Sequence, residues 1–138
     1  MFSFTSLSAL IQSIVRMPFS KAGSDGFIRH TVDCFNAYEG LDWRQTHTSP
    51  FKTVIRLYTT PEYDLELSRV DVRRCLRYPQ APSYIVRSLQ NRVHIFDGYR
   101  SHELSPHEPA HVFYPNQGLQ CDSDDTIRDA YLMICRTK

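Results

Sequence analysis

Near the N-terminus, apolar and polar residues follow each other with the period of an amphipathic helix. The apolar positions show the i, i+3, i+4, i+7, i+8 spacing of one helical face; they are Leu7, Leu10, Ile11, Ile14 and Val15. Pro18 cannot continue such a helix, so we expect it to end near Arg16 or Met17. Residues 1–23 also contain no acidic side chain. The pattern therefore predicts an N-terminal helix or leader over residues 1–23 and one domain over residues 24–138.

The apolar face of this helix has three interpretations. It docks on the domain or on a second copy of the chain, it belongs to an organelle transit peptide, or it inserts into a membrane surface. A transit peptide is amphipathic, rich in hydroxyl groups and poor in acids, as residues 1–23 are. A transmembrane helix needs roughly 20 apolar residues, and this run is much shorter.

The patterns after residue 50 are those of an antiparallel sheet. Segments dense in β-branched and aromatic residues, or alternating between apolar and polar, predict strands; they cover residues 51–60, 63–67, 83–89, 92–96, 99–104 and 126–137. Asp97-Gly98 is typical of a tight hairpin turn. A short helical element is expected before Gly40, and residues 44–50 should form a polar loop.

One helix is expected inside this run of strands. Ser68 stands three residues before Asp71, close to a capping box, and predicts a helix from there to Tyr78. Residues 105–125 are rich in proline and acidic side chains and predict a long surface loop. The fold class is therefore α+β: an antiparallel sheet of about five or six strands, one short helix after the second strand, and an N-terminal amphipathic helix.

Composition excludes several classes of protein. The 138 residues are 41% hydrophobic, which excludes a wholly disordered or collagen-like chain. The net charge of +1 gives no global field that would attract nucleic acid. Four widely spaced cysteines form no C-x-x-C pair and predict free thiols in an intracellular, reducing compartment. That compartment would be the mitochondrial matrix if residues 1–20 were a cleaved leader.

Arginines on the helix expected after Ser68 are candidates for binding a polyanion. Arg69, Arg73 and Arg77 recur every four residues, with Arg74 beside them. On a helix these side chains would share one face and repel each other unless an anionic partner compensated their charge. The pattern suggests an RNA- or polyanion-binding module as an alternative function.

His107, Glu108 and His111 match the H-E-x-x-H pattern of zinc hydrolases. The pattern works on a helix, which places both imidazoles on one face and lets the glutamate activate a metal-bound water. Pro109 would kink such a helix and separate the two rings. A zinc hydrolase is the second alternative, and the His-rich segment 102–111 is a further metal-binding candidate.

No catalytic constellation stands out beside the amphipathic helix. We therefore expect a non-enzymatic interaction or assembly protein without catalytic residues or a cofactor. Through Leu7, Leu10, Ile11, Ile14 and Val15 it would self-associate or dock on a protein complex or a membrane surface. Viral matrix proteins and organelle assembly subunits are analogies at the level of the fold only.

Overall fold

Two helices precede nine strands in the computed structural model, which describes residues 2–46 and 52–138. The helices are α1 (Leu7–Val15) and α2 (Phe19–Ala37), followed by the short 3-10 helix η1 (Trp43–Gln45). The strands are β1 (Val54–Thr59), β2 (Tyr63–Val70), β3 (Leu76–Tyr78), β4 (Tyr84–Gln90), β5 (Val93–Phe96), β6 (Ser101–Leu104), β7 (His111–Phe113), β8 (Leu119–Ser123) and β9 (Ala130–Thr137).

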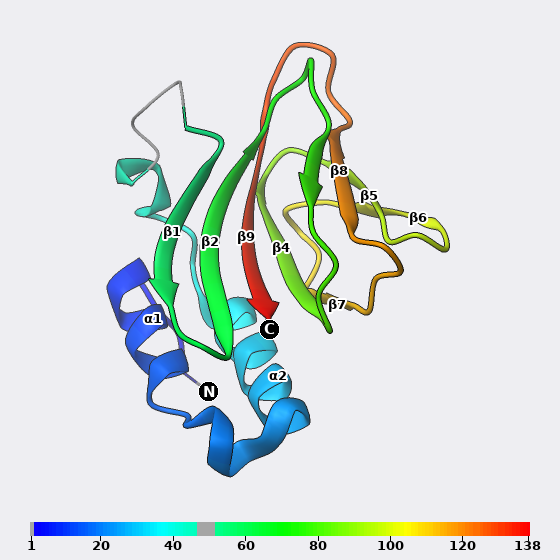
Figure 1. Ribbon diagram of the computed structural model, residues 1–138. Helices are drawn as coiled ribbons and strands as arrows, with labels where there is room; N and C mark the ends of the chain where they lie inside the picture. Colours follow the sequence, from blue (N-terminus) through cyan, green and yellow to red (C-terminus); the bar gives the residue numbers. More distant parts are fainter. Residues whose placement is uncertain (1, 47–51) are drawn as a thin grey trace.

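The strands form two antiparallel sheets that face each other (Figure 1). One sheet has the order β1-β2-β9-β4-β7 and the other the order β3-β8-β5-β6. This alternation of the chain between two four- or five-stranded layers is the arrangement of a jelly roll. One apolar core fills the space between the sheets, and a second lies between the five-stranded sheet and the two helices. The mixed α and antiparallel β class expected from the sequence is confirmed.

Helix α1 packs on its own domain. The Ser6 side chain caps it by accepting from the backbone N–H of Ala9 at 3.1 Å, and the N–H of Leu7 donates to the Asp42 carboxylate. Leu7, Leu10 and Ile14 are buried in the core beneath the helices, and Ile11 packs at its margin. The apolar face predicted from the sequence therefore covers the five-stranded sheet.

Helix α2 crosses the expected boundary between residues 23 and 24. Gly23 has a φ of 68°, which kinks the helix at that point. After the kink, Phe27 and Phe35 are buried against the same sheet as α1. Neither helix, nor any other in the described ranges, is long and apolar enough to cross a membrane.

The helix expected from Ser68 to Tyr78 does not form, and this prediction was wrong. Strand β2 continues to Val70, a turn follows, and β3 begins at Leu76. All eight residues of β2 pair with β9, so the ladder uses the backbone groups that a helix would need. The Ser68 hydroxyl is buried and hydrogen-bonded to Tyr78 rather than capping a helix.

The described residues contain more strands than predicted, because β7 and β8 lie within residues 105–125 and β3 lies where the helix was expected. Strand β8 lies between β3 and β5, and β7 pairs with β4 at the edge of the larger sheet. A hairpin forms at Asp97-Gly98 as predicted, but its turn is longer than expected: Phe96 is opposite Ser101, so four residues form the turn, and Gly98 has a φ of 94°. Phe51 and most of the loop expected over 44–50 lie outside the described residues.

The docked position of α1 predicts a cost for shortening its buried side chains. Leu10 is 1% exposed, so Leu10→Ala should lower the free energy of unfolding by about 2–5 kcal/mol through lost burial and a cavity. Leu41 is 69% exposed and is the matched control, for which Leu41→Ala should change stability by less than about 0.5 kcal/mol. Urea denaturation followed by circular dichroism measures both values. Equal stabilities of the two variants would contradict the docking of α1.

Candidate functional site

The space between the two sheets is a candidate site, because barrels bind ligands in their interior or mouth. The side chains that fill it are mostly apolar; they include Val70, Tyr84, Val86, Val93, Ile95, Phe113, Leu119, Leu132 and Ile134. Polar side chains enter from β2 and β9, where Asp64, Glu66 and Arg136 face the same space in register. Asp64 and Glu66 are buried, and the Arg136 side chain is 17% exposed.

Asp64 is held ionised by two basic side chains. Arg136 Nη2 donates to its Oδ2 at 2.5 Å, and Lys138 Nζ lies 3.1 Å from its Oδ1. Burial alone would raise the pKa of Asp64, but the hydrogen bonds from Arg136 and Lys138 outweigh it and hold the pKa below its ordinary value. This carboxylate is therefore part of a buried ion pair rather than a group poised to exchange protons.

The Glu66 carboxylate has weaker contacts with basic side chains than the Asp64 carboxylate has. Its Oε1 lies 3.6 Å from Arg56 Nε, whereas its Oε2 is buried without a hydrogen-bond partner. Burial raises the pKa of Glu66 above its ordinary value, because the charged form loses its hydration. The interior thus contains one carboxyl group that destabilises the fold when it ionises.

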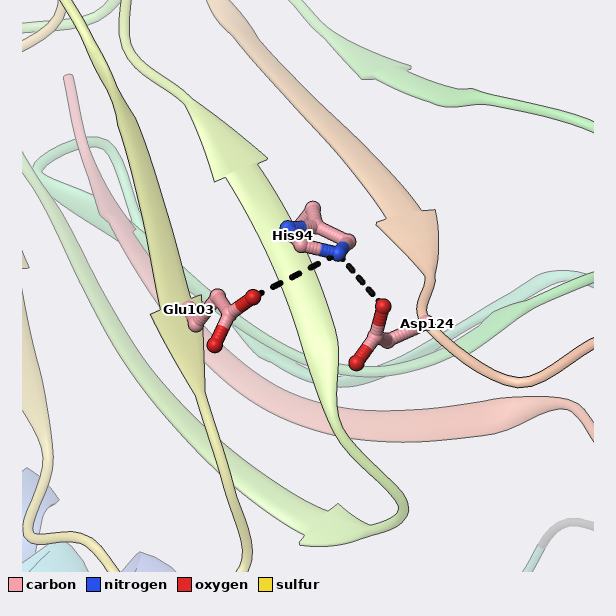
Figure 2. Close-up of side chains that lie close together, drawn as sticks. All are labelled: His94, Glu103 and Asp124. Carbon is pink, nitrogen blue, oxygen red and sulfur yellow. Dashed lines mark hydrogen bonds and ion pairs between the residues drawn. The ribbon is translucent and has the colours of Figure 1, made fainter.

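A second cluster lies on the outer face of the four-stranded sheet, where His94 of β5, Glu103 of β6 and Asp124, just after β8, are presented to solvent. Figure 2 shows the imidazole of His94 on β5 between the two carboxylates. His94 Nε2 lies 2.5 Å from Asp124 Oδ1 and 3.8 Å from Glu103 Oε1. One ligand atom from each of the three residues lies within 4.8 Å of the others, which is compact enough to hold a metal ion.

Hydrogen bonds of the backbone position these three residues next to one another. His94 is directly opposite Glu103 in the β5–β6 ladder and opposite Asp122 in the β5–β8 ladder. Asp124 follows β8, and its N–H donates to the carbonyl of Arg92 at 3.0 Å. Residues directly opposite in adjacent strands have Cβ atoms about 4.5–5.5 Å apart, so the register brings His94 and Glu103 together, while Asp124 reaches His94 diagonally from beside Arg92.

Arg92 supplies the positive charge of the cluster. Its Nη1 lies 3.8 Å from Glu103 Oε2 and 3.8 Å from Asp124 Oδ2. A hollow of about 360 Å³ adjoins the cluster, lined by Asn91, Arg92, Asp124, Asp125 and Thr126. The face therefore combines one imidazole, two carboxylates, a guanidinium and an open concavity.

The H-E-x-x-H segment is not helical in this fold. Residues 105–108 form a turn, with the N–H of Glu108 donating to the carbonyl of Ser105 at 3.1 Å, and His111 lies in β7. The helix that would align His107 with His111 is absent, as Pro109 indicates. His111 instead packs beside Phe113 and His102, and burial followed by the charge of His102 lowers its pKa.

The four arginines of the expected polyanion site are not aligned. Arg69 lies in β2, 3.8 Å from Asp129, and Arg77 lies in β3. Arg73 and Arg74 are exposed in the turn between these strands. Without a helix, the four-residue spacing no longer places them on one face.

The cluster of His94, Glu103 and Asp124 was not predicted from the sequence. The three residues are 9 and 21 positions apart and belong to no motif. The sequence indicated a hairpin at Asp97-Gly98, but a two-residue turn there would set His94 opposite Ser101, whereas the observed four-residue turn sets it opposite Glu103. Asp124 could be added only once β8 was known to lie beside β5.

Glu66 gives the fold a testable dependence on pH. Because its pKa is raised in the folded state above the ordinary value of 4.5, the unfolded chain loses this proton first as pH rises, and stability falls through that range. Glu66→Gln should therefore be more stable than wild type at pH 7, and the difference should disappear below the ordinary pKa. Thermal unfolding from pH 3 to 8 measures this, with Glu103→Gln, at a side chain 56% exposed, as the control. A wild-type protein more stable than Glu66→Gln at pH 7 would refute it.

This chain is similar to known proteins in its fold alone. No family model matches the sequence, and no curated protein matches it. Among solved structures, a cupin-2 domain protein from Shewanella frigidimarina matches with a TM-score of 0.52 and 9% identity, over 70% of this chain and 91% of that one. A protein from Thermus thermophilus matches with a TM-score of 0.54 and 10% identity, over 67% of this chain and 92% of that one.

A third similar structure is the cupin domain of an XRE family transcriptional regulator from Enterobacter cloacae, with a TM-score of 0.51, 13% identity, and coverage of 62% of this chain and 94% of that one. At such low identity these matches establish architecture rather than activity. The nine strands in two facing sheets, with two helices on one of them, form a cupin-like fold.

Proposed function

We propose that this chain is a non-enzymatic interaction protein that self-associates, using the exposed edge strand β1. The proposal rests on the position of β1, which is the edge strand of the five-stranded sheet. In the described ranges no further strand pairs with its outer side. The apolar face of α1, which first suggested assembly, is buried within its own domain. A partner would therefore meet the sheet edge rather than that face.

The backbone of β1 offers unpaired hydrogen-bonding groups. At one end the N–H of Arg69 donates to the carbonyl of Thr53, and at the other the N–H of Thr60 donates to the carbonyl of Tyr63. In an antiparallel pair, successive residues point their backbone N–H and C=O groups alternately towards the partner strand and away from it. Val54 is next to Thr53 and Thr59 is next to Thr60, so both direct these groups away from β2. Such a row of groups is a template for another strand.

The side chains of β1 suit pairing with a second copy. Ile55 and Leu57 are partly buried against the helical core, and Tyr58 is 37% exposed beside them. Arg56 is the only charged residue of the strand, and it faces Glu66 at 3.6 Å. Antiparallel pairing of two β1 strands about a two-fold axis would join two sheets into one, using the same surface on both partners.

Tyr58→Lys should convert an associated wild-type protein to a monomer, because a lysine on an edge strand opposes strand pairing. Tyr114→Lys is the matched control, since Tyr114 is 61% exposed and lies away from β1. Size-exclusion chromatography with light scattering measures the mass of each variant across a concentration series.

Val54→Pro tests the backbone part of the same proposal. It removes an outward N–H without removing a bond to β2, so it should also yield a folded monomer. Circular dichroism confirms folding of each variant. A wild-type protein that is monomeric at millimolar concentration, or a dimer that both substitutions leave intact, would refute the proposal.

A further inference from the structure

We infer that His94, Glu103 and Asp124 form a binding site for a divalent transition-metal ion of the Zn²⁺ type on the outer face of the four-stranded sheet. The site lies on the sheet opposite to the one that carries β1, so it is independent of the proposed self-association. It is also separate from the H-E-x-x-H segment and from the buried charges between the sheets.

The first support is that the backbone, not the flexible side chains, creates the convergence. His94 and Glu103 are directly paired residues of one hairpin, and Asp124 is tied to the carbonyl of Arg92, two residues before His94. Three neighbouring segments of a hydrogen-bonded sheet thus present one ligand each. Sites built on strands position their ligands more precisely than sites on loops.

The second support is the chemistry of the donors. One imidazole nitrogen with carboxylate oxygens is a set that zinc and similar first-row ions accept, whereas Mg²⁺ and Ca²⁺ favour oxygen ligands alone. Three protein ligands leave a position for water or another ligand, and the hollow of about 360 Å³ begins at Asp124 and Arg92. The arrangement is therefore that of an open metal site.

The distances require only small adjustments. Ligand atoms around a tetrahedral zinc ion are about 3.3 Å apart, given Zn–N and Zn–O bonds near 2.0 Å. Here His94 Nε2 is 2.5 Å from Asp124 Oδ1 and 3.8 Å from Glu103 Oε1, so the ion would widen the first pair and narrow the second. Both carboxylates are partly exposed, so rotations of their side chains can supply these changes.

The charges of the cluster also favour the binding of a cation. Glu103 and Asp124 together carry two negative charges, and Arg92 neutralises one of them through loose contacts of 3.8 Å to both. An arriving cation would take over this role, displace the guanidinium towards solvent, and lie between His94 Nε2 and the two carboxylates. The guanidinium and the metal ion therefore compete for the same two carboxylates.

Isothermal titration of the full chain with Zn²⁺, after removal of metals by a chelator, tests the inference. Wild type should bind one ion, and His94→Ala and Asp124→Asn should each weaken binding at least tenfold. His107→Ala is the matched control and should bind as wild type does, because His107 lies in a turn outside the cluster. Co²⁺ should report the same site through its visible absorption.

Arg92→Gln separates a metal site from a surface ion-pair network. Removing the competing guanidinium should tighten Zn²⁺ binding several-fold, whereas it would only loosen a network of ion pairs. Zn²⁺ should also raise the melting temperature of wild type but not of His94→Ala. Absence of stoichiometric binding, equal losses in His94→Ala and His107→Ala, or weaker binding by Arg92→Gln would each overturn the inference.

Discussion

The structure depends on burying both faces of the five-stranded sheet. Its central strand, β9, sends Leu132 and Ile134 towards the second sheet, and Met133 and Cys135 towards the helices. An antiparallel sheet with two apolar faces cannot leave either one in water without losing the burial that stabilises it. The chain meets this constraint by folding the four-stranded sheet over one face and packing α1 and α2 over the other (Figure 1).

This constraint explains the position of the N-terminal helix. An amphipathic helix with a free apolar face is available to a membrane or a partner, whereas here Leu10 and Ile14 are buried in the core shared by the helices and the five-stranded sheet. The sheet therefore takes up the surface that would otherwise have been a docking face. Backbone groups at the sheet edges stay open to a partner, because two facing sheets that do not close completely leave their outer strands open.

The two charged clusters differ because of their access to water. Between the sheets, Asp64 stays ionised only because Arg136 and Lys138 reach it, and Glu66 lacks equivalent partners. On the outer face, His94, Glu103 and Asp124 keep their hydration and adjust their positions at little cost. The buried cluster therefore acts on stability and its dependence on pH, while the exposed cluster is accessible to an ion from solution.

The local sequence determined the features whose causes lie within a few residues. The helical spacing of α1 with its Pro18 limit, the Asp97-Gly98 turn and the β-rich segments were all visible in this way. The same local signals failed at Ser68, where a near-capping box lies in a strand paired along its whole length with β9, some 60 residues away. They failed again at β7 and β8, short strands among prolines whose pairing partners are distant in the sequence.

Only the tertiary structure decided which residues share a site. The pairs that the sequence suggested, His107 with His111 and the arginines from Arg69 to Arg77, needed helices that the sheet did not permit. The cluster in Figure 2 arises instead from strand order, which places β5 between β6 and β8. Strand order is set by the burial of whole sheet faces, a property of many residues together, and no local pattern in the chain encodes it.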